Sequence, residues 1–332
     1  MHSIVARARL IADDVLFPAA LATDAADLVP AGSLDLLARE GLYGIGGPVE
    51  AGGLGVDLPS TYEIVEALAG GCLSTTFVWL QHRNPVRAVA ASATPGLREA
   101  WLEPLCRGEL RAGIALAGNR PGPPLLVASR TPRGISLSGE APWASGWGRI
   151  DVVMVAARRA DSVITALVDA EESPSLRVER LRLVGANASG TVTLRFQDHL
   201  VPAERLVGEE THARVLERDA ASLRLNGSLA LGLVSRCCRL MGPSALDEEL
   251  EKTRAELDAA DASTLAAARA RATELALRAA GALVVATGAR SILIDQHAQR
   301  LAREALFLLV FGSRPPIRAE LLRRLGATPT SP

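Results

Sequence analysis

Glycines and arginines are the residues of this chain whose types and spacing could serve a phosphate-bearing ligand. Gly52, Gly53 and Gly55 lie close together in a loop that spans residues 44–57. Glycine lets a backbone approach a phosphate closely, but these glycines follow no predicted strand, so the dinucleotide-binding fingerprint does not apply and turn glycines are the simpler interpretation. Four arginines near the C-terminus could bind phosphates through charge-assisted hydrogen bonds, or could equally pair with neighbouring glutamates. These arginines are Arg300, Arg303, Arg314 and Arg318, and the glutamates are Glu304 and Glu320.

Cysteine spacing and overall charge exclude several classes of protein. The four cysteines form no CxxC pair, which predicts no metal site and reduced, mostly buried thiols in a cytoplasmic protein. A net charge of −1 argues against binding to nucleic acid or to a membrane surface, because both usually need a basic excess. No run of about 18 apolar residues lacks a charge, so no transmembrane span is predicted. Closely spaced charges near the N-terminus argue against a secretory signal.

The elements that must position any site fall into three parts. Apolar residues at three- and four-residue spacing predict helices up to about residue 112, one of them opened by a capping box at Ser60 and ended by Gly70-Gly71. Short apolar runs separated by turns predict an all-β segment over 113–208, and Thr191–Phe196 alternates as a half-buried strand does. So many short strands favour a barrel or two packed sheets over one flat sheet.

From residue 209 the pattern returns to helices. Predicted helices cover 215–240, 264–287, 299–310 and 317–325, and Gly242-Pro243-Ser244 interrupts them. The predicted fold class is therefore α+β and multidomain. It comprises an N-terminal helical domain (1–112), a middle β domain (113–208), a C-terminal helical bundle (209–327) and a tail (328–332) that is expected to fray.

This helical–β–helical order resembles the acyl-CoA dehydrogenase superfamily. Five local segments are similar to that family's segments and occur in the same order, so the resemblance covers essentially the whole chain. They are Gly41–Ile45 with Pro48 and Gly52–Gly55; Trp143-Ala144-Ser145 with Asp151; Phe196; Val201–Gly208; and Arg300–Glu304.

The resemblance implies a cofactor, a substrate and partners. Members of the family bind FAD between the β domain and the C-terminal helices, and a neighbouring subunit completes the site. The implied cofactor-binding positions here are Leu116, Ala117, Trp143, Ala144, Ser145, Gly288 and Ser313. The implied substrate is an acyl-CoA thioester, and the implied assembly is a homodimer, a homotetramer or a hetero-oligomer with a paralogous subunit.

The catalytic glutamate of the family is missing from both positions where it is expected. That glutamate removes an α-proton while a hydride passes to the flavin, and the site must lower the pKa of the α-proton with hydrogen bonds to the thioester carbonyl. Phe311 and Ser222 occupy the two positions, so the catalytic residue is unknown. A substitute base is to be sought among four residues, namely His297, Asp295, Glu217 and Asp219.

Other interpretations of the same residues stay open. Trp143 could be a core or interface aromatic, and Ser145 could close a turn with Gly146. Ala117 lacks the hydroxyl that would bond the flavin, and the family's Gly-Gly-x-Gly turn is reduced to Gly288-Ala289-Arg290.

Three functions follow from these observations. The preferred one is a FAD-dependent oxidoreductase that introduces an α,β double bond into an acyl-CoA thioester. The second is a catalytically degenerate subunit that pairs with an active paralogue. The third is a flavin-dependent monooxygenase or oxidase of the same fold, which needs no α-proton base.

Overall fold

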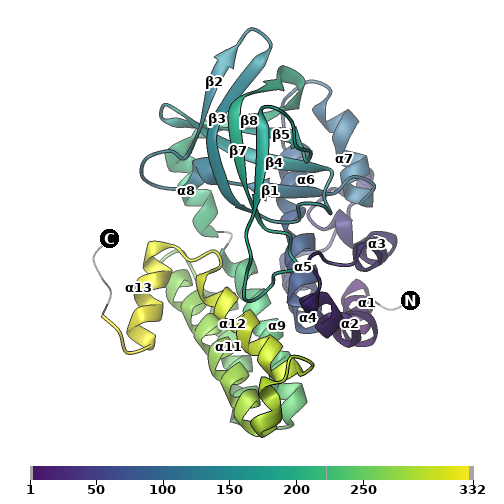
Figure 1. The fold of residues 1–332 in the computed structure, drawn as a ribbon, viewed down its shortest axis with the longest axis vertical. Helices are drawn as coiled ribbons and strands as arrows, with labels where there is room; N and C mark the ends of the chain where they lie inside the picture. Colours follow the sequence, from purple (N-terminus) through teal and green to yellow (C-terminus); the bar gives the residue numbers. More distant parts are fainter. Residues whose placement is uncertain (1–2, 222, 329–332) are drawn as a thin grey trace.

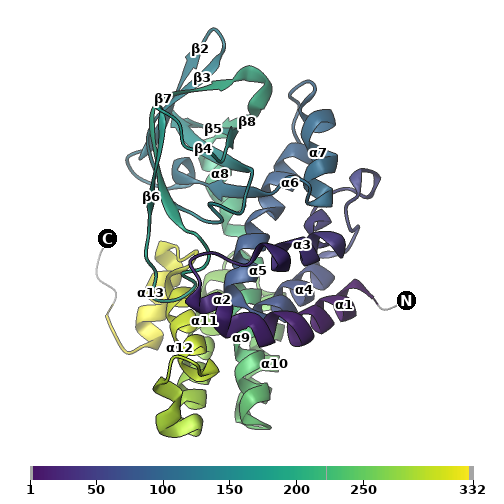
Figure 2. The same cartoon turned by 45° about the vertical axis from the view of Figure 1, so that its right-hand side comes forward.

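Three groups of elements build the molecule in chain order. The computed structural model describes residues 3–221 and 223–328. Figure 1 shows the β domain at one end, the C-terminal helices at the other, and the N-terminal helices beside both; Figure 2 shows the same arrangement from the side. The predicted order of helical, β and helical parts is confirmed.

The N-terminal part is helical up to Arg107. Its helices are α1 (Ile4–Ile11), continued by a π-helical turn (Ala12–Leu16), α2 (Phe17–Ala25), α3 (Ala31–Arg39), α4 (Leu58–Gly71), α5 (Leu73–Gln81), α6 (Arg83–Ala90) and α7 (Leu97–Arg107). The predicted start of α4 at Ser60 is wrong. The carboxylate of Asp57 accepts the N–H of Ser60 at 2.9 Å, so Asp57 caps the helix and Pro59 lies in its first turn, where its missing N–H costs nothing.

Hydrogen bonds join the strands of the β domain into one open sheet. The strands are β1 (Ala112–Ala115), β2 (Leu126–Thr131), β3 (Gly134–Ala144), β4 (Val152–Arg159), β5 (Ser162–Asp169), β6 (Leu176–Arg180), β7 (Val192–Pro202) and β8 (Leu206–Thr211). Their order is β6-β7-β3-β2-β4-β5-β8, with β1 parallel to β4, so β6 and β8 are edges and the barrel alternative is wrong.

The sheet consists of two halves that share a core. The only register pair between β2 and β4 is Val127 with Arg158, which is a narrow link. Leu137 and Leu194 from one half and Val153 and Ile164 from the other belong to a single buried cluster. The halves therefore fold over one another, which agrees with the alternative of two packed sheets.

The described residues of the C-terminal part form six helices. They are α8 (His212–Ala221), α9 (Leu223–Met241), α10 (Ala245–Ala259), α11 (Leu265–Thr287), α12 (His297–Val310) and α13 (Pro315–Arg324), with a 3-10 turn (Gly288–Ile292) after α11. The predicted helix over 215–240 is assigned as α8 and α9, on either side of residue 222. Ser244 opens α10 with a capping box, since Asp247 accepts the N–H of Ser244 at 2.8 Å.

Two glycines bring the N-terminal helices into contact with the C-terminal bundle. Gly70 of α4 faces Gly232 of α9, and a Cβ on Gly232 would lie 2.2 Å from the carbonyl oxygen of Glu66. The guanidinium of Arg236 donates to the Gly70 carbonyl at 2.5 Å. The two helix backbones thus touch directly, which fixes α4 and its neighbour α5 against α9.

One described helix is long and apolar enough to cross a membrane by length and composition alone. It spans Leu265–Ile292, that is, α11 and the turn after it. Its buried side chains, including Leu275 and Leu283, belong to the same core cluster as those of α9 and α12. These side chains pack one face of α11 against the rest of the bundle.

Candidate functional site

An aromatic cluster occupies the expected position of the catalytic glutamate. Phe311 directly follows α12, and its ring meets that of Phe77 on α5 edge to face at 4.9 Å. Phe307, one turn earlier on α12, stacks on Phe311 at 5.6 Å and meets Phe77 at 5.0 Å. A phenyl ring has no proton-accepting group, so residue 311 cannot act as a base. Ser222, the alternative position, lies outside the described residues.

A buried arginine supports the backbone at the same place. Arg269 of α11 is fully buried, donates to the hydroxyl of Thr273, and makes a long hydrogen bond (3.4 Å) to the carbonyl oxygen of Phe311. Burial lowers its pKa to about 10. The C-terminal end of α12 carries partial negative charge, and this dipole partly offsets the buried cation.

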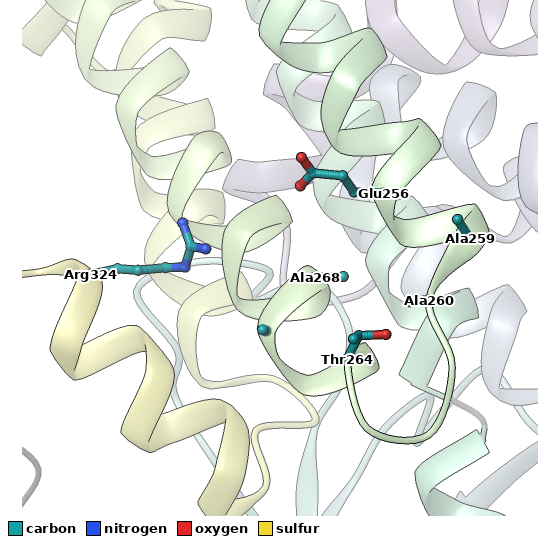
Figure 3. A pocket seen from close by; sticks show the side chains of 7 residues that line it. Glu256, Ala259, Ala260, Thr264, Ala268 and Arg324 are labelled. Atoms are coloured by element: carbon teal, nitrogen blue, oxygen red, sulfur yellow. The ribbon is translucent and has the colours of Figure 1, made fainter.

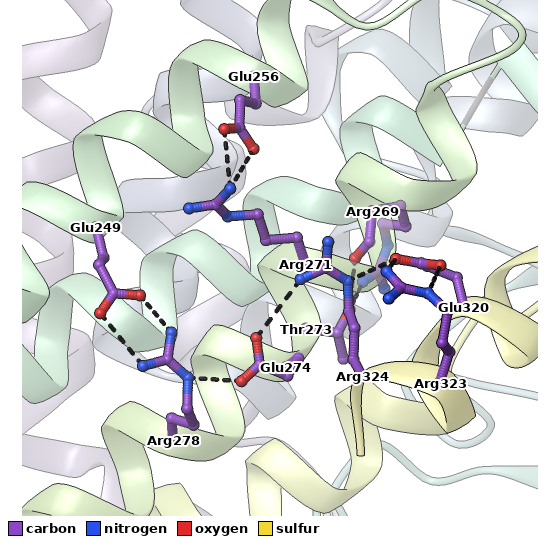
Figure 4. A network of polar contacts seen from close by, with 10 residues as sticks. All are labelled: Glu249, Glu256, Arg269, Arg271, Thr273, Glu274, Arg278, Glu320, Arg323 and Arg324. Atoms are coloured by element: carbon purple, nitrogen blue, oxygen red, sulfur yellow. Dashed lines mark hydrogen bonds and ion pairs between the residues drawn. The ribbon is translucent and has the colours of Figure 1, made fainter. Parts of the chain in front are cut away.

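Ion pairs tie the helices around Arg269 together, but Arg269 is not part of them. Figure 4 shows Arg271 paired with Glu256, and Arg278 bridging Glu249 and Glu274, across α10 and α11. Arg269 has no carboxylate partner among the residues that the structure describes. The sequence does not predict that Arg269 is buried, because nothing in its local sequence distinguishes it from the other arginines of this alanine-rich helix.

Trp143 is held exposed by a strained backbone at the end of β3. Its indole is 54% exposed, and its φ of +68° lies in the left-handed region that few residues other than glycine adopt. The register between β3 and β7 shifts between Ala141 and Ala144, which places this strain at a bulge. The core-aromatic interpretation of Trp143 therefore does not hold within one chain.

The Ser145 hydroxyl is already paired, and the predicted residues after β1 have no polar side chain. The Ser145 hydroxyl is buried and lies 2.8 Å from that of Thr191, which in turn lies 2.7 Å from that of Ser189. Ala144 is buried beside it. Ala117 is also buried and opens a short 3-10 turn, while Leu116 packs between the β domain and α8.

Part of the predicted site is brought together within one chain. A Cβ on Gly146 would lie 3.4 Å from the side chain of Val78, so the segment that follows β3 touches α5. Val78 is the neighbour of Phe77, which contacts Phe311. The segment after β3 and the end of α12 thus contact consecutive residues of α5, and Ser313 lies two residues beyond Phe311.

Gly288 lies far from this place. Arg269, near the start of α11, contacts Phe311, whereas Gly288 directly follows the end of the same helix. At 1.5 Å per residue, the nineteen residue steps from Arg269 to Gly288 span about 28 Å. Gly288 and Phe311 therefore lie near opposite ends of α11 within one chain.

Two of the predicted substitute bases lie far from Phe311. His297 and Asp295 lie at the start of α12, about 21 Å along that helix from Phe311. His297 stacks on Phe17 at 4.1 Å, and burial with nearby arginines lowers its pKa to about 4. Glu217 is exposed on α8. The side chain of Asp219 lies outside the described residues.

Two of the four predicted phosphate-binding arginines form ion pairs with carboxylates of this chain. Arg300 is buried in an ion pair with Glu304 at 2.7 Å. Arg303 pairs with Asp24 and donates to the carbonyl oxygen of Val184 at 2.8 Å. These contacts favour the interpretation of paired, structural arginines for both.

Two shallow hollows lie away from the predicted residues. One, of about 350 Å³, lies between α10, α11 and α13 (Figure 3). Its lining consists of Glu256, Ala259, Ala260, Thr264, Ala267, Ala268 and Arg324. The other, of about 250 Å³, lies beside Trp147 and Leu28. Neither is lined by a residue of the predicted cofactor site.

Comparisons with known proteins show which family this chain resembles. The sequence profile of the acyl-CoA dehydrogenase N-terminal domain matches residues 2–109. Mitochondrial isobutyryl-CoA dehydrogenase of Bos taurus is 28% identical over 195 residues, which is 56% of this chain and 47% of that protein. The chain thus matches about half the length of the curated relatives it resembles.

Solved structures of the family share the whole fold. Butyryl-CoA dehydrogenase of Megasphaera elsdenii superposes with a TM-score of 0.79 at 18% identity, covering 98% of both chains. Glutaryl-CoA dehydrogenase of Mycobacterium smegmatis in complex with FADH2 gives 0.83 at 15% identity, covering 99% of this chain and 95% of that one. Residues 2–109 of this chain thus match the N-terminal domain of the acyl-CoA dehydrogenase family, and the chain shares the fold of these structures.

Proposed function

We propose that this chain binds FAD and serves as an acyl-CoA dehydrogenase-like oxidoreductase acting on an acyl-CoA thioester. The observation that carries the proposal is Trp143, an exposed indole held in a left-handed backbone beside the buried Ser145. Strain of this kind persists where the surrounding structure enforces it, and it clusters at ligand-binding sites. Resemblance to a family with flavin-bound structures supports the same function.

The residues at the end of β3 fit one face of a planar ring. The Trp143 indole offers an exposed aromatic surface, and the Ser145 hydroxyl, already paired with Thr191, can still accept one further hydrogen bond. Bound FAD would supply the hydride acceptor. The protein's part would be to orient the ring and to exclude water, and contacts from a position such as Gly288 would have to come from a second subunit.

The absorption spectrum of the purified protein tests this function directly. We expect a flavin band in the wild type, its loss in Trp143→Ala and its retention in Trp143→Phe, which keeps a flat ring. Anaerobic addition of butyryl-, isobutyryl- and octanoyl-CoA should bleach the band with at least one thioester. A protein that stays colourless after incubation with FAD would refute the proposal.

A second function is favoured by the aromatic cluster at Phe311. Since residue 311 has no carboxylate, the chain would be a subunit that pairs with an active paralogue and lacks its own α-proton base. The discriminating result is a flavin band that no thioester bleaches in the wild type but that bleaches in Phe311→Glu. Bleaching of the wild type itself would eliminate this alternative.

Self-association is proposed through an exposed apolar surface at the junction of α11 and α12. Its members are Val285, Ile292, Leu293 and Ile294, and Ile294 is 91% exposed. Contiguous exposed apolar side chains usually mark an interface. Because Gly288 lies within this surface, a second copy docking there would be close to it.

A further inference from the structure

Arg83 is a buried cation without a counter-charge. It is the first residue of α6, its side chain is 8% exposed, and its Nε has no hydrogen-bond partner within residues 3–221 and 223–328. Burial, followed by the repulsion of Arg87, lowers its pKa to about 10. A buried guanidinium normally has a carboxylate beside it, and here the groups that act on its charge are a second arginine and the phenol of Tyr62.

The chain holds the two arginines together at a glycine. Gly46 has a φ of +88°, and a Cβ on it would lie 3.0 Å from Cγ of Arg83 and 3.1 Å from Cγ of Arg87. Both side-chain stems therefore cross the loop at the same point. Arg83 and Arg87 are four residues apart on α6, so their side chains leave the helix on the same face.

Neighbouring groups do not relieve this positive charge. Arg83 and Arg87 lie four residues apart on α6, a spacing at which like charges repel. Tyr62 also lies under Arg224 at 4.0 Å, but Arg224 has its own partner in Asp258. Arg83 and Arg87 are thus the two arginines of this group that form no ion pair with a described carboxylate.

We infer that Arg83 and Arg87 bind an oxoanion, namely a phosphate or carboxylate group of a small ligand. A guanidinium presents parallel N–H donors that match two oxygens of such a group. Arg83 is the buried donor, and Arg87 is the second, exposed cation. The inference rests on Arg83 and Arg87 alone and does not depend on the proposed flavin chemistry.

Calorimetric titration of the full chain with inorganic phosphate and with acetate, at constant ionic strength in chloride buffer, tests the site. We expect at least one of the two anions to bind, Arg83→Gln to weaken it at least tenfold, and Arg87→Gln to weaken it several-fold. Arg98→Gln is the matched control, since Arg98 is an exposed arginine on the next helix. Binding of phosphate alone assigns a phosphate-bearing ligand, and comparable binding of acetate assigns a carboxylate.

Thermal unfolding in chloride buffer separates a ligand site from a structural role. Because Arg83→Gln removes an uncompensated cation, we expect its melting temperature to equal or exceed that of the wild type. The inference fails if neither anion binds the wild type, or if Arg83→Gln keeps the wild-type affinity.

Discussion

The carbonyl oxygen of Phe311 lies 3.4 Å from Nη2 of Arg269, so the residue at the family's base position is held by a buried cation through its backbone. This contact involves only the backbone of Phe311 and leaves the packing of its side chain to other residues. Its ring now completes an aromatic cluster with Phe77 and Phe307.

Phe311→Glu is expected to fold with a pH-dependent penalty. A carboxylate placed between two phenyl rings is desolvated, which raises its pKa, so the variant should lose about 2 kcal/mol of unfolding free energy at pH 8 and less at pH 5, where the carboxyl is protonated. Urea unfolding at both values measures this, with Phe311→Leu as the uncharged control. An equal penalty at both values would contradict the aromatic environment of the site.

Gly232→Ala is expected to separate α4 from α9. The added Cβ would lie 2.2 Å from the Glu66 carbonyl oxygen, where only the backbone can give way, so the unfolding free energy should fall by about 3 kcal/mol. Gly281→Ala is the matched control, since it lies within α11 with nothing within 4 Å and should gain about 0.5–1 kcal/mol. If the denaturant midpoints of both variants shifted in the same direction, the close contact between α4 and α9 would be refuted.

His82 is expected to make the protein less stable in mild acid. Nε2–H of its buried ring donates to the Leu105 carbonyl and Nδ1 accepts the N–H of Ala112, each at 2.9 Å. Burial lowers its pKa to about 4, below the usual 6.5. The unfolded chain therefore takes up a proton that the folded protein refuses, and about 3 kcal/mol is lost as the pH falls from about 6.5 to about 4.

Comparing wild type with His82→Gln isolates this contribution, because all other groups titrate alike in both. The amide keeps a donor and an acceptor but does not titrate in this range. We expect the difference between the two unfolding free energies to shrink as the pH is lowered, and a constant difference would exclude His82 as the source.

Ile294→Glu is expected to reduce the assembly size. Placing a charge at the most exposed member of the apolar surface should shift the protein towards smaller species in light scattering coupled to gel filtration. Val49→Glu is the control, because Val49 is an exposed apolar residue on an N-terminal loop far along the chain. An unchanged mass for Ile294→Glu would place the subunit contacts elsewhere.

The sequence was sufficient for the fold but only for part of the site. Strands with a buried run, such as β4, were predictable, whereas β6 and β8 carry one buried residue each and show no alternation. The Asp57 cap was missed because Ser60 opens an equally regular capping pattern, although Pro59 marks the first turn.

Contacts between side chains of different helices and strands could not be predicted from the sequence. Every residue of α5 is buried, so periodicity could not single out Phe77 as the face turned towards α12. Trp143-Ala144-Ser145 could be found as a local motif, because its three residues are consecutive. The separation of Gly288 from Ser313 depends on the length and direction of α11, which no local motif reports.

The distance between Gly288 and Ser313 within one chain also makes ligand binding depend on protein concentration. If a ligand is held by Ser313 of one chain and Gly288 of another, then occupancy depends on the encounter of two chains as well as on the ligand. Dilution alone would release such a ligand, and two variants defective in opposite halves of the site would restore binding when mixed. Because of the length of α11, the functional unit for binding would be a pair of chains and not a single chain.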